Sequence, residues 1–292
     1  MTATPASVVI PQGTSAPISV KAFRLGDRTP AARFQVSPPA GLSAAPASGT
    51  ISVDRTTGVG SAQVTITVAA GTPDGRYSVP VTVTTADRAT LPHLAVTVVV
   101  GQPGSFTVLR NNVGISDDAT SHDEADFDTG GVSFSKQALA AAGLVPGGQS
   151  TVDGLAFTWP NVPGGQPDNI GTNGDQLNLT GIPATATRLA FVGSAANGDQ
   201  PGKATLMYAD GTTQEVDLSF SDWTLGGGGG SLQFGNVVVA KTPYRNEAGG
   251  GRDDVATYIL ATAPVTLLAG KQLTAVKLPN NTDIHVFAVA AG

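Results

Sequence analysis

The sequence predicts an all-β protein with two domains, and three observations lead to this prediction. Its apolar residues occur in short runs, several of which alternate with polar residues at the period of two that is typical of half-buried strands. Turn-forming residues separate the runs, and the 292 residues include 37 Gly and 20 Pro. The length exceeds the roughly 100 to 200 residues that one domain usually contains, so two domains are expected.

The first domain is expected to span residues 1–103. AQVTITV and RYSVPVTVT show the alternation most clearly, and turn signals such as TPDG separate the runs. Seven short strands with regular turns predict an immunoglobulin-like sandwich, without the Cys and Trp pattern of antibody domains. The seven runs are Ser7–Ile10, Ile18–Phe23, Arg33–Val36, Thr50–Val53, Ala62–Val68, Tyr77–Thr85 and His93–Val100.

The second domain is expected to span residues 104–292, after the linker-like sequence GQPGS. Roughly ten further strands predict a larger β-sandwich of the jelly-roll type. One helix is expected in SKQALAAAG, because Ser135 suits the N-cap and Gly143 suits the C-terminal end. The clearest strands are Ala156–Trp159, Arg188–Gly193, Ala204–Tyr208, Glu215–Phe220, Val237–Ala240, Ala256–Ala261, Leu273–Leu278 and Ile284–Val289.

Charge and composition disfavour several classes of partner. Residues 1–103 carry a formal charge of +3, which leaves −9 for residues 104–292 out of the total of −6. No basic cluster is present in the second part, so neither nucleic acid nor an anionic membrane surface is an expected partner. Apolar stretches such as LAVTVVV fall short of the roughly 20 residues of a membrane-spanning helix. Cysteine is absent, so thiolate metal sites and disulfides are excluded.

The start of the chain lacks the features of a signal peptide. Residues 1–10, MTATPASVVI, have neither a basic segment nor an apolar core. We therefore expect the sequence to begin inside a longer polypeptide whose export signal and catalytic part lie upstream.

The stretch Phe220–Asn246 is the main candidate for ligand binding. Gly226–Gly230 allow another backbone or a ligand to approach closely, which side chains would prevent. Aromatic faces suit the CH patches of pyranose rings, and planar polar side chains suit paired sugar hydroxyls. The alternative for the two tryptophans is that they are core residues. The residues predicted to bind carbohydrate are Trp159, Asp222, Trp223, Tyr244, Arg245 and Asn246.

An acidic segment, residues 111–131, is the candidate metal site. It holds six carboxylates within twelve residues and no Lys or Arg. Hard oxygen ligands favour calcium, so a structural calcium ion is one interpretation, with a solvated acidic loop as the other. The segment does not fit an EF-hand loop, because Gln137 stands where a bidentate Glu is needed. The predicted ligands are Asp117, Asp118, Asp126 and Asp128.

No combination of nucleophile, base and metal is recognisable, so we expect a protein that is not catalytic by itself. A glycosidase would need two carboxyl groups flanking the scissile bond. The candidates Asp168, Asp222, Asp253 and Asp254 all lie among turn residues, where Asp commonly caps turns. The glycine run is not a phosphate loop, because Ser231 and Leu232 follow it.

Several motifs together resemble a known arrangement of domains. They are NNVGISDD, FSKQALAAAGLVPGG, DGLAFTWPNVPGGQPDNI, FVGSAANG, FSDWTLGGGGG and TPYRN. The chain resembles the C-terminal accessory region of secreted actinobacterial glycoside hydrolases such as α-mannosidases, in which an Ig-like domain of the NPCBM-associated type precedes a β-sandwich module. The resemblance implies a secreted, non-catalytic carbohydrate-binding region that accompanies a catalytic domain. The alternatives are a scaffold that docks on that domain without binding sugar and, less favoured, a glycoside hydrolase in its own right.

Overall fold

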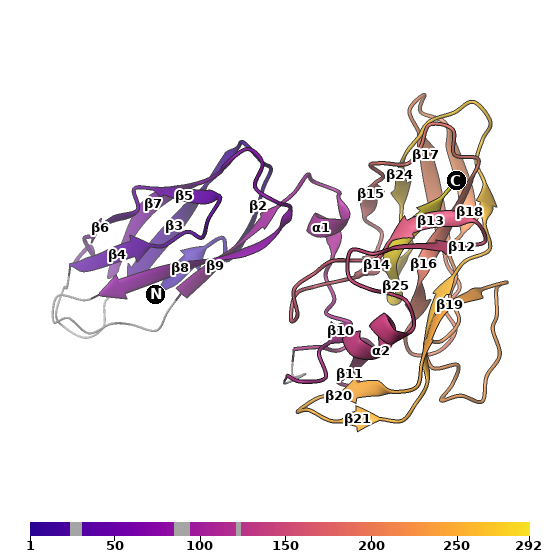
Figure 1. Cartoon of the computed structure of the whole chain (residues 1–292). Helices are drawn as coiled ribbons and strands as arrows, with labels where there is room; N and C mark the ends of the chain where they lie inside the picture. Colours follow the sequence, from indigo (N-terminus) through magenta and orange to yellow (C-terminus); the bar gives the residue numbers. More distant parts are fainter. Residues whose placement is uncertain (24–30, 85–93, 121–123) are drawn as a thin grey trace. The chain divides into compact units, whose positions relative to one another are not determined.

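The computed structural model describes the chain except for residues 24–30, 85–93 and 121–123. It divides into two compact units, Met1–Pro103 and Gly104–Gly292 (Figure 1). Both units consist almost entirely of strands, and each has hydrophobic core clusters of its own. The all-β prediction is therefore confirmed.

The first unit is a sandwich of two sheets. One sheet contains, in spatial order, β1 (Thr2–Thr4), β3 (Ser15–Phe23), β7 (Val59–Val68) and β5 (Leu42–Ala45). The other contains β2 (Ser7–Ile10), β9 (Leu94–Val100), β8 (Gly75–Thr84), β4 (Ala32–Val36) and β6 (Ser48–Ile51). All pairs are antiparallel except β2 with β9. One apolar core contains residues of both sheets.

The predicted count of seven strands in this unit was too low, since the described residues form nine. The seven predicted runs correspond to β2, β3, β4, β6, β7, β8 and β9. The prediction missed β1 and β5 because both are short and rich in small or polar residues, without a buried alternating pattern. The predicted strand ends at Thr85 and His93 lie outside the described residues.

The second unit contains three sheets. The largest runs β12 (Gln149–Val152), β13 (Leu155–Thr158), β25 (Asn280–Ala291), β16 (Arg188–Ala195), β22 (Thr257–Ala261) and β19 (Val237–Thr242), with β14 (Ile170–Asn173) on β25 and β23 (Val265–Thr266) on β16. The second runs β15 (Gln176–Asn178), β24 (Leu273–Lys277), β17 (Lys203–Tyr208) and β18 (Thr213–Asp217). The third runs β10 (Ile115–Ser116), β11 (Val132–Ser135), β20 (Arg245–Glu247) and β21 (Arg252–Asp253).

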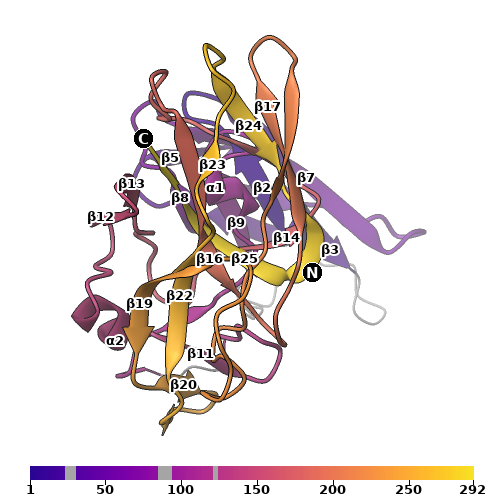
Figure 2. The same cartoon turned by 90° about the vertical axis from the view of Figure 1, so that its right-hand side faces the viewer.

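Strands β16 and β25 lie side by side in the middle of the largest sheet (Figure 2). Their residues are buried on both faces of the sheet. On one face, Phe191 and Val286 pack in a cluster with residues of the second sheet. On the other face, Val192 and Phe287 pack against residues from β11, the helix after it and the loops. Burial on both faces explains why these strands are nearly continuous apolar runs without polar alternation. The second unit therefore has two cores, one on each side of this sheet.

Two short helices complete the second unit. Helix α2 (Lys136–Ala141) begins as predicted, since the Ser135 hydroxyl accepts a hydrogen bond from the Ala138 amide at 3.0 Å. Gly143 follows its end with φ of +96°, a conformation that favours glycine. Helix α1 (Phe106–Leu109) is a single turn that the sequence did not predict. Neither of these helices is long enough to cross a membrane.

Replacing Gly193 in β16 by alanine tests how tightly the two central strands pack. An added Cβ would lie 2.0 Å from the main-chain oxygen of His285 in β25 and 2.7 Å from the ring of Phe220. Because main-chain atoms of a central strand cannot move aside, we expect Gly193→Ala to lower the free energy of unfolding by about 3 kcal/mol. Urea unfolding measures this. Gly229→Ala is the control, because no atom lies within 4 Å of its added Cβ. Equal stability of the two variants would contradict the packing described.

Candidate functional site

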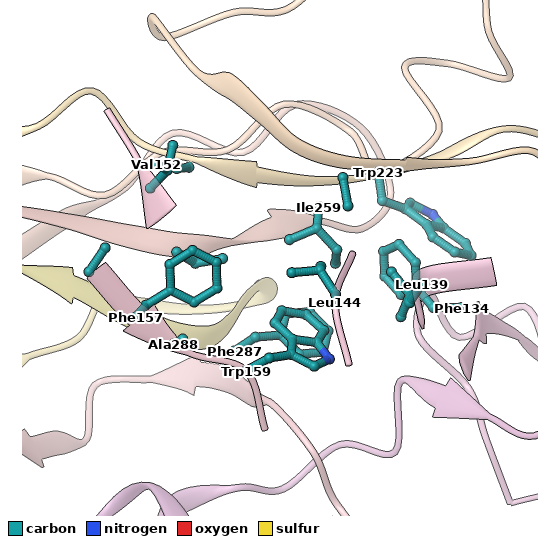
Figure 3. Packing of buried hydrophobic residues seen from close by; sticks show 14 of the residues in the cluster. Phe134, Leu139, Leu144, Val152, Phe157, Trp159, Trp223, Ile259, Phe287 and Ala288 are labelled. Atoms are coloured by element: carbon teal, nitrogen blue, oxygen red, sulfur yellow. The ribbon is translucent and has the colours of Figure 1, made fainter. Parts of the chain in front are cut away.

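The two tryptophans predicted to stack on sugar rings lie in the core instead (Figure 3). Trp159 is 2% exposed and stacks on Phe287 at 5.1 Å between ring centroids. Trp223 is 1% exposed and lies 4.9 Å from both Phe127 and Phe134. The expectation that both indoles present an open face to a ligand was therefore wrong, and the alternative interpretation as core residues describes them. The physical reason is the large apolar area that each ring removes from water.

Asp222, also predicted to bind a ligand, holds the start of the polyglycine loop. Its Oδ1 accepts hydrogen bonds from the Thr224 amide and hydroxyl and from the Gly226 amide, at 2.6 to 3.0 Å. Its Oδ2 accepts from the Gly198 amide at 3.0 Å. Burial alone would raise the pKa of Asp222, but these bonds together hold it below its usual range. The carboxylate is a turn cap and is not free to contact a ligand.

Tyr244 and Asn246 meet one of the predicted metal ligands, Asp118. The Tyr244 hydroxyl donates to Asp118 Oδ2 at 2.6 Å, and the Asn246 amide donates to Oδ1 at 3.0 Å. The Ser135 hydroxyl, next to helix α2, donates to Oδ1 at 2.6 Å. Burial disfavours the charged form of Asp118 and by itself would raise its pKa. The three donors outweigh this effect and keep the pKa of Asp118 below its usual range. The carboxylate of Asp118 thus has its hydrogen bonds from within the protein, two of them from residues more than 100 positions away in the sequence.

Arg245 holds two carboxylates and covers a buried ring. Its Nε and Nη2 both lie 2.9 Å from Asp253 Oδ2, and its Nη1 lies 3.7 Å from Asp128 Oδ2. Its guanidinium also lies 5.4 Å from the centroid of the Trp223 ring. Burial raises the pKa of Asp128, and the charge of Arg245 opposes that rise. Arg245 therefore closes the core at β20 and has its donors engaged within the protein.

The four predicted calcium ligands do not converge on one point. Asp117 accepts bonds from the Ala119 amide and Gln137, and Asp126 accepts from the Gly131 amide. Across the described residues, no group of three or more His, Cys, Asp or Glu side chains is arranged to hold a metal ion. The four residues therefore do not fit the predicted shared site. Two further polar residues of this segment, His122 and Asp123, lie outside the described residues.

Asp168 is a buried acid whose pKa departs strongly from the ordinary value of an aspartate. Its carboxylate accepts bonds from the amides of Gly114 at 3.2 Å and Ile115 at 3.0 Å, and from the side chain of Asn169 at 2.8 Å. Its complete burial raises its pKa to about 7. The carboxylate lines a cavity of about 30 Å³ together with Asp117 and Lys136. That space suits roughly one water molecule, so the cavity is too small to hold a sugar ring.

His285 is linked to Asp168 through Asn169. His285 Nδ1 lies 2.7 Å from Asn169 Oδ1, while the Asn169 amide group donates to Asp168 and to Asn112. Since Asn169 presents its oxygen to the ring, Nδ1 carries the proton of the neutral imidazole. Burial lowers the pKa of His285 to about 4. The network anchors the segment before β10 to strand β25.

A groove of suitable size lies at one edge of the sandwich, which we call the edge groove. It has a volume of about 310 Å³ and runs between β18, the edge strand of the second sheet in the described structure, and the connection from β22 to β23. Phe234 is one of the residues that line it. Its lining residues are Gln214, Glu215, Val216, Asp217, Ser219, Phe234, Thr262, Ala263, Pro264 and Val265.

Phe234 is an exposed aromatic residue of the second unit that the sequence analysis missed. The residue is 44% exposed, and its φ is +55°, which is rare for a bulky residue. The loop is held on both sides of it, because the Gln233 amide donates to the Ser221 hydroxyl and Asn236 Oδ1 accepts from the Ser221 amide. Phe234 follows the polyglycine run within the stretch predicted to bind ligands. Its place in SLQFGNVVV is typical of a core residue, so the sequence carried no signal of exposure.

Comparison with known proteins assigns the second unit to a family. Residues 109–292 match the model of the AziU2-like beta-sandwich domain. The chain belongs to this family. The AziU2-like domain contains every candidate site described above, including the edge groove. No curated protein matches the sequence.

Solved structures resemble the chain only weakly. The secreted serine protease VesC from Vibrio cholerae is 9% identical, over 98% of this chain and 49% of that chain, with a TM-score of 0.28. The CupB2 chaperone from Pseudomonas aeruginosa is 12% identical, over 88% and 99%, with a TM-score of 0.27. The Bacteroides ovatus protein SGBP-B, in complex with a mixed-linkage heptasaccharide, is 10% identical, over 97% and 71%, with a TM-score of 0.17. Structural similarity at TM-scores this low supports no conclusion about this protein, and the family assignment rests on the match of residues 109–292 alone.

The buried polar network predicts how the stability of the AziU2-like domain depends on pH. Asp168 has a higher pKa when folded, about 7 against 3.8, so its contribution to stability falls as the pH rises between these values. His285 has a lower pKa when folded, about 4 against 6.5, so its contribution rises over that window. The two contributions oppose each other from about pH 4 to 6.5.

Removing Asp168 and removing His285 should therefore change the slope of stability against pH in opposite directions. We expect the free energy of unfolding of Asp168→Asn to rise with pH relative to the unmodified protein, by about 1.4 kcal/mol per pH unit. We expect that of His285→Gln to fall by a similar amount. Urea unfolding at pH 4.5, 5.5 and 6.5 measures the slopes, and three parallel profiles would contradict the burial of these groups.

Proposed function

We propose that residues 104–292 form a non-catalytic carbohydrate-binding module that holds a glycan in the edge groove. The observation that supports this proposal is the exposed ring of Phe234 beside a groove with polar walls. A pyranose presents CH groups to an aromatic face, and its hydroxyls need hydrogen-bonding partners at the edge of that contact. The buried tryptophans do not offer such a face.

The polar walls of the groove differ in how free they are to contact a ligand. Gln214 is engaged with Tyr208 and the Thr266 carbonyl, and Ser219 with the main chain of Gly202. The side chains of Glu215 and Asp217 are 69% and 75% exposed, and both pair with the exposed Lys203. They can accept hydrogen bonds from sugar hydroxyls, so the proposed contact combines one ring with two carboxylates. Such a shallow site implies weak binding.

The wider context of the proposal comes from the sequence motifs. Their resemblance to accessory regions of secreted glycoside hydrolases supports a role beside a catalytic domain, with residues 1–103 as a spacer. In this proposal the module binds the glycan on which the partner enzyme acts, and the chemistry takes place in the partner. A structural calcium ion is not part of the proposal, because the acidic side chains do not form a common site in the described residues.

A second candidate function is docking on another protein domain without sugar binding. The observation that favours it is the exposure of two aliphatic residues that are close to Phe234 in the sequence: Leu232 is 38% exposed and Val238 is 44% exposed. Neighbouring exposed apolar residues are typical of protein contact surfaces. Leu232 does not line the edge groove, so it separates the two candidate functions experimentally.

Phe234→Ala tests the proposed function. We expect it to weaken binding of a responding glycan roughly fivefold to tenfold, because the stacking face is lost while the carboxylates remain. A glycan array identifies the ligand, and calorimetric titration measures the dissociation constants. Leu232→Ala is the matched control, from the same loop and similarly exposed, and should bind like the unmodified protein.

Two results would contradict the proposal. One is the absence of any glycan response from the folded protein. The other is equal binding by Phe234→Ala and the unmodified protein. A loss of association with a catalytic domain in both Leu232→Ala and Phe234→Ala, without a glycan response, would instead support docking.

A further inference from the structure

We infer that the edge groove selects glycans that carry free amino groups, such as oligomers of glucosamine, over neutral glycans and against uronic acids. This inference rests on the proposed function and adds the class of ligand to it. It follows from the charges that line the groove, from the position of Lys203 beside them and from the exposed aromatic face.

The first step concerns the charged lining of the groove. Its charged residues are Glu215 and Asp217, and its lining contains no Lys, Arg or His. The two acids are separated by one residue on strand β18, so both point to the same side of the sheet. They belong to a part of the chain whose formal charge is −9. An anionic sugar would be repelled there, whereas an ammonium group would be attracted.

The second step concerns Lys203, which shows that these carboxylates accommodate a primary ammonium group. Lys203 lies on β17 opposite Asp217. Its Nζ is 2.7 Å from Asp217 Oδ1 and 3.8 Å from Glu215 Oε1, so one ammonium group contacts both acids. The hydrogen bond to Asp217, followed by its charge, raises the pKa of Lys203. The surroundings of the two acids therefore favour a positive charge.

The third step is that Lys203 can give up this position. Its side chain is 62% exposed, and those of Glu215 and Asp217 are 69% and 75% exposed. Ion pairs that are exposed to this extent contribute little to stability. Lys203 is absent from the lining of the groove, so it reaches the acids from the neighbouring strand. The ammonium group of a bound sugar would compete with Lys203 for the same oxygens.

The fourth step concerns the ring of Phe234 on the same groove. An aromatic face attracts cations as well as CH groups. A glucosamine unit carries both at mildly acidic pH, at which the titrations below are made, because its ring presents CH groups and its C2 amino group is then protonated. An N-acetylglucosamine unit keeps the ring but lacks the charge. Comparing the two sugars therefore isolates the contribution of the charge, because both of them can stack on the ring of Phe234.

The experiment titrates the whole chain with three oligosaccharides of equal length: a glucosamine oligomer, an N-acetylglucosamine oligomer and a galacturonate oligomer. At low salt we expect the glucosamine oligomer to bind roughly fivefold more tightly than its acetylated counterpart, as expected for exposed ion pairs. We expect no measurable binding of the galacturonate oligomer. The preference should shrink between 20 and 300 mM NaCl, since salt screens exposed charges.

Two variants move the preference in opposite directions. Glu215→Gln combined with Asp217→Asn removes both charges and should bring the ratio of the two dissociation constants to about one. Lys203→Ala removes the competitor and should increase the ratio roughly twofold to threefold. A merely structural role of Lys203 would change stability without changing this ratio.

The outcomes separate this inference from the proposed function. Equal binding of the charged and acetylated oligomers, both weakened by Phe234→Ala, would overturn the selectivity and leave carbohydrate binding intact. Failure of all three oligomers, together with a silent glycan array, would overturn the proposed function. Tighter binding of an oligolysine peptide than of the glucosamine oligomer would also overturn the inference, because the groove would then select a basic protein segment.

Discussion

Burial of strands β16 and β25 on both faces is the constraint on which the AziU2-like domain depends. One face packs on the second sheet, and the other is covered by β11 of the small third sheet, helix α2 and loops. Helix α2 has only six residues, too few to cover that face alone. Large aromatic residues from β11 and the loops, among them Phe134, Trp159 and Trp223, provide much of the rest of the cover. This requirement explains why both tryptophans lie inside the protein.

The same requirement organises the polar residues near the edge of that second core. Arg245 lies over the Trp223 ring and binds Asp253, while Tyr244 and Asn246 bind Asp118. Asp118, Asp222 and Asp253 each meet hydrogen-bond donors within the protein, as buried or half-buried charges require. Residue types that suit ligand binding are thus used here to seal the core. The edge groove lies outside this layer and keeps its own carboxylates exposed.

Sequence patterns predicted the features that depend on neighbours along the chain. Alternation predicted the longer strands, and the Ser135 cap with Gly143 predicted helix α2, because both depend on nearby residues. Contacts between distant residues could not be predicted in this way. Asp118 meets Tyr244 across 126 positions, so the sequence could not distinguish a metal ligand from a satisfied acid. Indole rings suit both a core and a sugar, and the apolar surroundings of Phe234 in sequence favoured burial where the structure exposes it.

The polyglycine loop has a consequence for how this domain can diverge among relatives. At Gly226, Gly227, Gly228 and Gly229 an added Cβ would meet no atom within 4 Å, so this part of the loop carries no packing of its own. The cost of closing a loop grows slowly with its length. Insertions and deletions at this point are therefore nearly neutral for the two sheets, and the bonds of Gln233 and Asn236 to Ser221 keep the following aromatic residue in place. Relatives can therefore differ in the number of glycines here and keep the same fold.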